Sequence, residues 1–154
     1  ESGDDFVYGM AGNDVLFGDA GDDILIGCSG DDSLLGGAGI DIFALESGDE
    51  VSVGPPAVDT IGDFVVGANG DVLDLSDMLQ DEEMGALVDY FDFSYNAVTG
   101  DTTISIDVDG NSGVFVTSQQ IVLTYVDLTA GGTLTTNQEI LDNLLSNGNL
   151  IVDQ

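Results

Sequence analysis

Five aspartates recur every nine residues near the start of the chain, and carboxylates at a fixed spacing are candidate ligands for a metal ion. They are Asp5, Asp14, Asp23, Asp32 and Asp41. A glycine stands two residues before each of them, and a large apolar residue stands two residues after each. The phase holds without slippage through residue 44. A fixed period of this kind indicates that each copy is one structural unit stacked on its neighbours.

Each copy predicts a turn followed by a short strand. The first six positions are rich in glycine, which tolerates the positive φ of tight turns, and the last three are mainly β-branched, aromatic or aliphatic. One copy then forms half a coil, so copies two apart stack at the strand spacing of about 4.8 Å. The apolar residue at position eight points inward and gives a thin core of Val7, Leu16, Leu25, Leu34 and Phe43.

The same stacking brings the aspartates together along the two edges of the coil, where they repel one another. Two carboxylates about 5 Å apart repel by roughly 3 kcal/mol at an effective dielectric near 20, and a whole domain is stable by about 5–15 kcal/mol. Calcium removes the repulsion because it takes about six to eight oxygen ligands, carboxylates and backbone carbonyls among them. We therefore expect about three or more Ca²⁺ ions, shared by Asp5 with Asp23, Asp14 with Asp32, and Asp23 with Asp41.

These copies resemble the calcium-binding nonapeptide of the RTX proteins, which Gram-negative bacteria export by type I secretion. In that family one turn supplies the carbonyls of positions two and four with its Asp, and the turn two repeats later supplies those of positions one and three with its own Asp. The ligands that the resemblance implies are Glu1, Gly3, Asp5 with Gly18, Ala20, Asp23; Met10, Gly12, Asp14 with Gly27, Ser29, Asp32; and Asp19, Gly21, Asp23 with Gly36, Ala38, Asp41. The chain departs from the family pattern at position two, where Met10, Asp19 and Cys28 replace glycine.

Other acidic residues outside the repeats are weighed separately. In related rolls the region of Asp59 and Asp63 helps to close the last calcium site, so the resemblance makes Asp59 a candidate ligand and Asp63 a weaker one. The run from Asp107 to Asn111 resembles half of an EF-hand loop but lacks the distal Glu, which favours a solvated turn.

The composition excludes several classes of function. The chain has 154 residues, no Lys, Arg or His, and a net charge of −30. Nucleic acid is a poor partner because phosphate binding depends on basic side chains, and anionic membranes are disfavoured for the same reason. Without histidine, Ser-His-Asp and Cys-His catalysis and His-ligated zinc are impossible, so we expect no enzymatic activity.

Three further features of the sequence concern disulfide bonds, membrane insertion and the extent of the chain. The one cysteine, Cys28, allows no internal disulfide. No apolar run approaches the roughly 18 residues of a membrane span, so we expect no membrane insertion. The sequence shows no signal peptide and starts in the middle of a repeat, and we expect it to be a fragment of a longer protein.

The rest of the chain predicts strands and a helix. Alternating apolar residues over 58–75, with a Gly-Asn-Gly turn, indicate strands, as do 91–95, 102–107, 120–126 and 150–152. Residues 81–90 have helical character, and a capping box of Thr136 and Glu139 opens a helix over 137–146 that Gly148 ends. We predict an all-β dominated fold: a parallel β-roll over 1–44, a linker over 45–57, and a β-rich cap over 58–154 with one to three short helices.

The second half resembles the C-terminal secretion-target region of large type I secreted RTX adhesins. The matching stretches are DTIGDFVVGANGDVLDLSDML (59–79), TTISIDVDGN (102–111) and QEILDNLLSNGNLIVD (138–153). The resemblance implies an address for an inner-membrane ABC transporter complex, upstream adhesin domains, and a secreted, extracellular or cell-surface location. The predicted function is a calcium-dependent folding and secretion module. Alternatives are the C-terminal secretion domain of an RTX protease or lipase, and a calcium-dependent carbohydrate-binding module.

An apolar strip on the outside of the repeats does not fit a bare roll. Positions seven and nine should face outward, yet they carry Phe6, Tyr8, Ile24, Ile26 and Ile42 on one sheet and Val15, Phe17 and Leu35 on the other. Contiguous apolar surface of this kind is rarely left in water. We therefore expect the C-terminal half, or a neighbouring chain, to cover at least one sheet.

Overall fold

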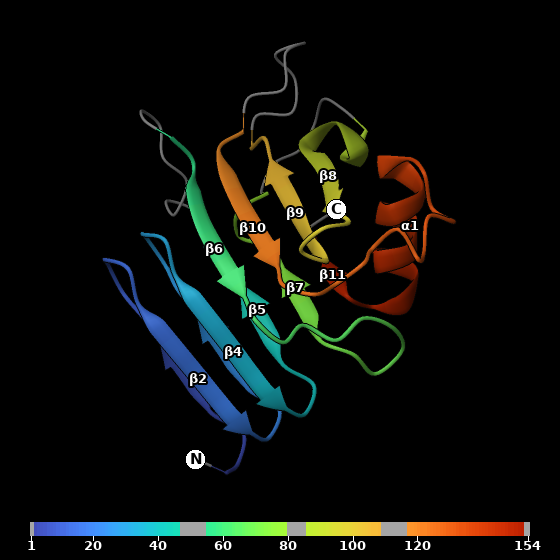
Figure 1. The fold of residues 1–154 in the computed structure, drawn as a ribbon. Helices are drawn as coiled ribbons and strands as arrows, with labels where there is room; N and C mark the ends of the chain where they lie inside the picture. The colour runs from blue at the N-terminus through green and yellow to red at the C-terminus, as the bar shows by residue number, and fades with distance from the viewer. Residues whose placement is uncertain (1, 47–54, 80–85, 109–116, 153–154) are drawn as a thin grey trace.

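The computed structural model describes residues 2–46, 55–79, 86–108 and 117–152, and in it the chain winds into a coil with a sheet on each side (Figure 1). One sheet is parallel and contains, in order, β1 (Phe6–Tyr8), β3 (Ile24–Ile26), β5 (Ile42–Ala44), β7 (Val72–Asp74) and β11 (Leu150–Ile151). The other contains β2 (Val15–Ala20), β4 (Ser33–Ala38), β6 (Ala57–Ile61), β10 (Gln119–Leu123), β9 (Asp101–Ile106) and β8 (Phe91–Asn96). Its last two pairings, β10 with β9 and β9 with β8, are antiparallel. The predicted all-β fold with a parallel roll is confirmed.

Two repeats make one turn of the coil, as the sequence predicts. Phe6 stands opposite Ile24 and Ile24 opposite Ile42, so each strand pairs with the strand two repeats later. The backbone carbonyl of each repeat aspartate accepts a hydrogen bond from an N–H of the next stacked strand. Examples are Ile24 N to Asp5 O at 2.9 Å and Ile42 N to Asp23 O at 2.8 Å. The nine-residue period therefore sets which residues lie above one another.

Both sheets continue past the last repeat into the second half of the chain. Strand β6 stacks on β4, with Ser33 opposite Thr60, and β7 stacks on β5, with Ile42 opposite Val72. Strands β10 and β11 then stack on β6 and β7. Both sheets are thus continuous across the predicted boundary between residues 57 and 58, so the strand pairing shows no division there. The division into roll, linker and cap stays a prediction.

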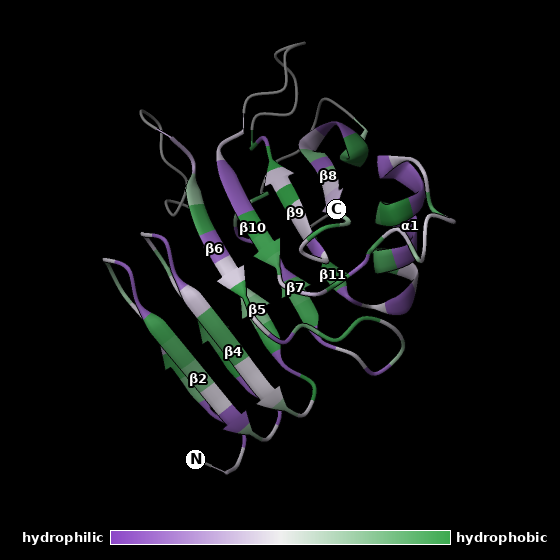
Figure 2. Ribbon diagram, viewed as in Figure 1, coloured by the Kyte–Doolittle hydropathy of each residue, from purple (hydrophilic) through white to green (hydrophobic). Residues whose placement is uncertain are grey.

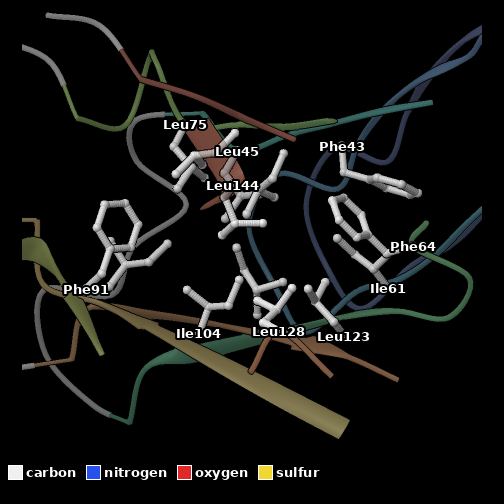
Figure 3. Packing of buried hydrophobic residues seen from close by; sticks show 14 of the residues in the cluster. Phe43, Leu45, Ile61, Phe64, Leu75, Phe91, Ile104, Leu123, Leu128 and Leu144 are labelled. Atoms are coloured by element: carbon white, nitrogen blue, oxygen red, sulfur yellow. The ribbon is translucent and has the colours of Figure 1, made fainter. Parts of the chain in front are cut away.

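The core is one hydrophobic cluster that spans both halves. Leu25 and Phe43 have no exposed surface and Leu34 has 1%, which confirms the inward position eight of the repeats. Val7, in the first rung, is partly buried against the same cluster. The cluster continues through Ile61 into the second half, and Figure 3 shows Phe43 and Phe64 beside residues of the later strands. Because the core is continuous, the repeats and the second half stabilise one another.

Helix α1 (Asn137–Asn147) closes the far end of the roll, where it contacts β8 and β11 (Figure 1). Its predicted limits are confirmed: Thr136 Oγ1 accepts from Glu139 N at 3.2 Å, and Gly148 adopts φ 78°. Its buried face is Ile140, Leu141 and Leu144. A short 3-10 helix (Leu87–Tyr90) lies at the end of the helix predicted over 81–90, whose first residues are outside the described ranges.

No helix in the described ranges combines the length and the apolar character that crossing a membrane requires.

Four large apolar side chains remain exposed on the first strand of each sheet. Phe6 is 65% exposed, Tyr8 48%, Val15 60% and Phe17 57%, whereas Ile26 in β3 is buried. In Figure 2 the first part of the β2 ribbon has the colour of hydrophobic residues. The described C-terminal residues extend the sheets at their other end and leave these four side chains uncovered. The expectation that the C-terminal half or a neighbouring chain covers at least one of the two sheets stays a prediction.

Close stacking of the turns makes a testable prediction at Gly21. Gly3 and Gly21 both adopt a strongly positive φ, 125° and 139°. A Cβ on Gly3 meets nothing within 4 Å, whereas a Cβ on Gly21 would lie 2.3 Å from the Gly3 carbonyl oxygen. Gly3→Ala should cost about 1–3 kcal/mol of backbone strain, and Gly21→Ala should cost about 1–3 kcal/mol more from overpacking.

The measurement is the free energy of unfolding of each variant in a denaturant titration with calcium present. Equal losses for the two variants would show that the turns do not stack this closely.

Candidate metal centre

The repeat aspartates form two hydrogen-bonded ladders along the edges of the roll. The backbone N–H of Asp5 donates to Asp23 Oδ1 at 2.7 Å, and that of Asp23 donates to Asp41 Oδ1 at 3.0 Å. On the other edge, Asp14 N donates to Asp32 Oδ1 at 2.8 Å. The predicted alignment of these five aspartates is therefore confirmed. Each rung uses one carboxylate oxygen and leaves the other, Oδ2, for a different partner.

Two aspartates beyond the repeats extend the ladders by one rung each. Asp59 Oδ1 accepts from Asp32 N at 2.9 Å, and Asp71 Oδ1 accepts from Asp41 N at 3.0 Å. The sequence analysis predicts Asp59 as a ligand and does not single out Asp71. The signal for both is an aspartate followed two residues later by an apolar residue, as in Asp71-Val72-Leu73. The glycine two residues before is missing at Asp71, where Asn69 takes its place with φ 66°.

Asp63 has a different role from the ladder aspartates. Its carboxylate accepts from Gly36 N at 3.0 Å and from Gly37 N at 2.9 Å, so it holds the last repeat turn through two backbone N–H groups. The acidic run that begins at Asp107 cannot be followed, because residues 109–116 are outside the described ranges. Asp107 itself is buried, at 2% exposure.

Three ladder carboxylates bury an oxygen that has no partner in the described part of the chain. These atoms are Asp14 Oδ2, Asp23 Oδ2 and Asp32 Oδ2. A buried charged oxygen without a partner is strongly destabilising. The protein has no Lys, Arg or His that could neutralise it. A bound cation is the partner that such oxygens fit.

Backbone carbonyls converge on the same spaces. The point where a Cβ of Gly18 would stand lies 2.4 Å from Asp23 Oδ2 and 2.6 Å from the Gly36 carbonyl oxygen. At Gly9 the corresponding distances are 3.2 Å to Asp14 Oδ2 and 2.7 Å to the Gly27 carbonyl oxygen. Beside each of these glycines, a carboxylate of the same repeat and a carbonyl of the turn two repeats later come close together. Glycine leaves room for both because it has no side chain.

The donor set fits calcium. Within the described residues no three acidic or cysteine side chains gather into a group that could hold a metal, so an ion between two rungs has to draw on backbone carbonyls as well. Calcium accepts this mixture of oxygen ligands, and softer metals prefer nitrogen or sulfur. Bound there, calcium would neutralise the stacked carboxylates.

The carbonyls selected from the sequence lie in the stacked turns. Four of them accept one hydrogen bond from a neighbouring turn: Met10 from Ser29 N, Ala20 from Gly3 N, Ser29 from Gly12 N, and Ala38 from Gly21 N. A carbonyl has two lone pairs, so each can still face a metal. Glu1 is outside the described residues. The complete ligand set carried over from the family stays a prediction.

The three replacements of glycine at position two are tolerated by a left-handed backbone. Met10 has φ 79°, Asp19 φ 76° and Cys28 φ 66°. This conformation costs a non-glycine residue about 1–2 kcal/mol.

A second ladder at position five was missed by our sequence reasoning. Asp22 N donates to Asp4 Oδ1 at 3.0 Å, Ile40 N to Asp22 Oδ1 at 2.8 Å, and Val58 N to Asp31 Oδ1 at 2.9 Å. The sequence signal is the Asp or Asn at this position in four of the five copies. These side chains are exposed and hold the turns by hydrogen bonds to the backbone.

Burial raises the pKa of the inner ladder carboxyls. For Asp32, Asp41 and Asp71 the largest cause is desolvation, followed by a backbone N–H bond that acts in the opposite direction. Neighbouring carboxylates add to the rise, Asp14 for Asp32 and Asp71 for Asp41. The calcium-free roll therefore resists full ionisation of its own ladders.

This geometry defines a parallel β-roll whose stacked turns carry oxygen ligands at both edges. The comparison with protein families agrees with this class. The model of the RTX calcium-binding nonapeptide repeat (4 copies) matches residues 1–27, 12–43 and 26–54. The match covers the first 54 of the 154 residues, which contain the nonapeptide repeats.

One solved structure has a similar fold. The chain is similar to the solution structure of the AlgE6R3 subunit from the Azotobacter vinelandii mannuronan C5-epimerase, with a TM-score of 0.50 and 22% identity over 80% of this chain and 71% of that chain. The AlgE6R2 subunit of the same enzyme matches with a TM-score of 0.39 and 20% identity, over 98% of this chain and 91% of that chain. No curated protein matches the sequence.

Asp32→Asn should have opposite effects with and without calcium. The amide keeps an oxygen that can accept from Asp14 N but removes a buried charge, so the calcium-free form should gain about 1 kcal/mol or more. With calcium, the loss of a carboxylate ligand should weaken binding at that site about tenfold or more, or about 1.4 kcal/mol. Thermal unfolding in chelator and in calcium measures both effects.

The matched control is Asp142→Asn, which makes the same change at an exposed position of α1. Its unfolding temperature should change little under both conditions. Destabilisation of the Asp32 variant in chelator would contradict the account of an uncompensated buried charge.

Lowering the pH should stabilise the calcium-free roll. The folded-state pKa values of Asp32, Asp41 and Asp71 lie above the ordinary value of 3.8, so the folded state binds more protons than the unfolded state. The free energy of unfolding then falls as the pH rises from the ordinary pKa through the raised folded-state values. In chelator, the unfolding temperature should be higher at about pH 4 than at about pH 7, and Asp32→Asn should reduce the difference. The opposite order would refute the assignment.

Proposed function

We propose that this chain is a calcium-dependent folding and type I secretion module at the C-terminus of a secreted RTX adhesin. The observation that carries the proposal is that three buried ladder oxygens have no partner among the described residues, in a chain that has no basic side chain: Asp14 Oδ2, Asp23 Oδ2 and Asp32 Oδ2. In calcium-poor cytosol, carboxylate repulsion keeps the repeats unfolded and able to pass a narrow channel. Outside the cell, calcium binds and the roll forms.

The expected calcium affinity and its contribution to the free energy of folding are large enough for such a switch. Extracellular calcium modules bind with dissociation constants of about 10⁻⁴–10⁻³ M. An ion that binds the folded state alone, at ten times its dissociation constant, adds about 1.4 kcal/mol to stability. Three or more such ions would contribute roughly 4 kcal/mol, a large part of the typical 5–15 kcal/mol of a domain. Calcium can therefore decide whether the roll is folded.

The secretion role is supported by the sequence of the second half. Its resemblance to the secretion-target region of RTX adhesins makes an ABC transporter complex the partner during export and adhesin domains the neighbours in the mature protein. The module then works outside the cell or at its surface. Because the chain lacks His, Lys and Arg, the role that we propose is structural and does not include a catalytic step.

Calcium-dependent folding is tested by circular dichroism. At the growth temperature of the cell the β-sheet signal should be largely lost in chelator, because the calcium-free chain unfolds below that temperature, and calcium titration should restore the signal in a cooperative transition. Magnesium at the same concentration is the control, because it demands a near-octahedral site and dehydrates reluctantly. A native β-sheet spectrum in chelator at the growth temperature would overturn the proposal.

Export is tested in cells that carry a type I secretion system. The full chain should appear in the medium, and a chain that ends at Asn96, without β9, β10, α1 and β11, should stay inside. Equal export of the two chains would separate calcium-dependent folding from secretion and remove the second part of the proposal.

A further inference from the structure

Asp59 links the repeats to the second half through its two carboxylate oxygens. Its Oδ1 accepts from Asp32 N at 2.9 Å, and its Oδ2 accepts from Gln119 Nε2 at 2.8 Å. Asp59 stands on β6, between β4 of the repeats and β10 of the second half. All three residues are buried, with exposures of 1% for Asp32, 2% for Asp59 and 0% for Gln119. The end of this ladder is therefore a closed, polar cluster inside the roll.

Two oxygens of this cluster have no hydrogen-bond partner in the described part of the chain. They are Asp32 Oδ2 and Gln119 Oε1. The orientation of the Gln119 amide is fixed, because turning it over would place its oxygen against the Asp59 carboxylate in place of the N–H donor. Buried polar atoms are almost always paired, and one that is not calls for an unseen water or ion.

The other ladder ends without such an atom. Asp71 Oδ1 and Oδ2 accept from Asp41 N and Val65 N at 3.0 and 2.8 Å. The Asn149 amide beside it donates to the Asp71 and Gly67 carbonyls and accepts from Gly67 N. The Asn149 amide thus has every group paired, whereas Gln119 Oε1 has no hydrogen-bond partner among the residues that the structure describes. The difference indicates that Gln119 has a partner of another kind.

We infer that Asp32, Asp59 and Gln119 form a divalent-cation site in which the Gln119 side-chain oxygen is a ligand, so that calcium bound there fixes β10 to the repeats. Side-chain amide oxygens are ordinary calcium ligands. Asp59 is hydrogen-bonded to both other residues, and a cation is a partner that a buried, unpaired side-chain oxygen such as Gln119 Oε1 fits. The inference rests on the calcium-dependent folding proposed above and adds a ligand from outside the repeats. Calcium binding would then extend to the second half.

Two substitutions of Gln119 test the site, and a neighbouring glutamine provides the control. Gln119→Met keeps the length of the side chain and removes the ligand. Gln119→Glu keeps an oxygen ligand but adds a charge beside Asp59. Gln120→Met makes the first change at the next residue, whose Nε2 donates to Ser105 Oγ at 3.1 Å on the adjacent strand. The full chain is stripped with chelator and titrated with calcium chloride in a calorimeter, and its unfolding temperature is followed against free calcium.

The expected results differ between the variants. Gln119→Met should bind one ion fewer than the wild type, or bind it at least tenfold more weakly, and its calcium-induced rise in unfolding temperature should be smaller. Gln119→Glu should unfold at a lower temperature in chelator and show a larger calcium-induced rise. Gln120→Met should match the wild type in ion count and in the calcium-induced rise.

The inference is overturned if Gln119→Met keeps the wild-type ion count and affinity, if it loses the same stability with and without calcium, or if Gln120→Met shows the same loss of binding. Should Gln119→Met not fold at any calcium concentration, Gln119→Glu decides, and an unchanged calcium-induced rise refutes the site. A wild type that binds no calcium refutes the proposed function, whereas a binding wild type with indistinguishable variants refutes this inference alone.

Discussion

Repulsion between stacked, buried carboxylates is the constraint on which the rest of this structure depends. Each turn of the coil places an aspartate over another, and the chain has no basic side chain to neutralise them. Backbone N–H groups satisfy Oδ1 of Asp23 and Asp32, whereas Oδ2 of both residues has no partner in the described part of the chain. The second oxygen is left for a cation. The stability of the roll therefore depends on the concentration of cations in the surrounding medium.

Glycine makes this arrangement possible because it lets turns approach closely enough to share a ligand. A carboxylate oxygen and a carbonyl oxygen from different rungs both reach the space beside Gly18, where a side chain would collide with them. The same close stacking fixes the register of the strands, which keeps Leu25, Leu34 and Phe43 inside the coil. Metal ligation and hydrophobic packing thus come from one repeat geometry, and neither can be changed without the other.

The second half of the chain continues this geometry after the repeats have lost their regular sequence. Asp59 and Asp71 take the ladder positions, and Ile61 and Leu73 take the inward positions. Farther along, strands β10 and β11 extend the sheets, and α1 packs its apolar face onto their end. A single core joins the ordered repeats to this irregular part. Calcium binding in the repeats and folding of the second half are therefore energetically connected.

The sequence by itself determined the coil, the inward residues, the two aspartate ladders and the limits of α1, because each depends on local periodicity or on a capping motif. Tertiary structure decided what local patterns do not encode. Asp71 and Gln119 reach the ladders through strand pairings between residues far apart in the chain, and Gln119 looks like any other polar strand residue in the sequence. The tertiary structure also decides that Phe6 and Phe17 are exposed, because the second half lengthens the sheets and does not cover their first strands.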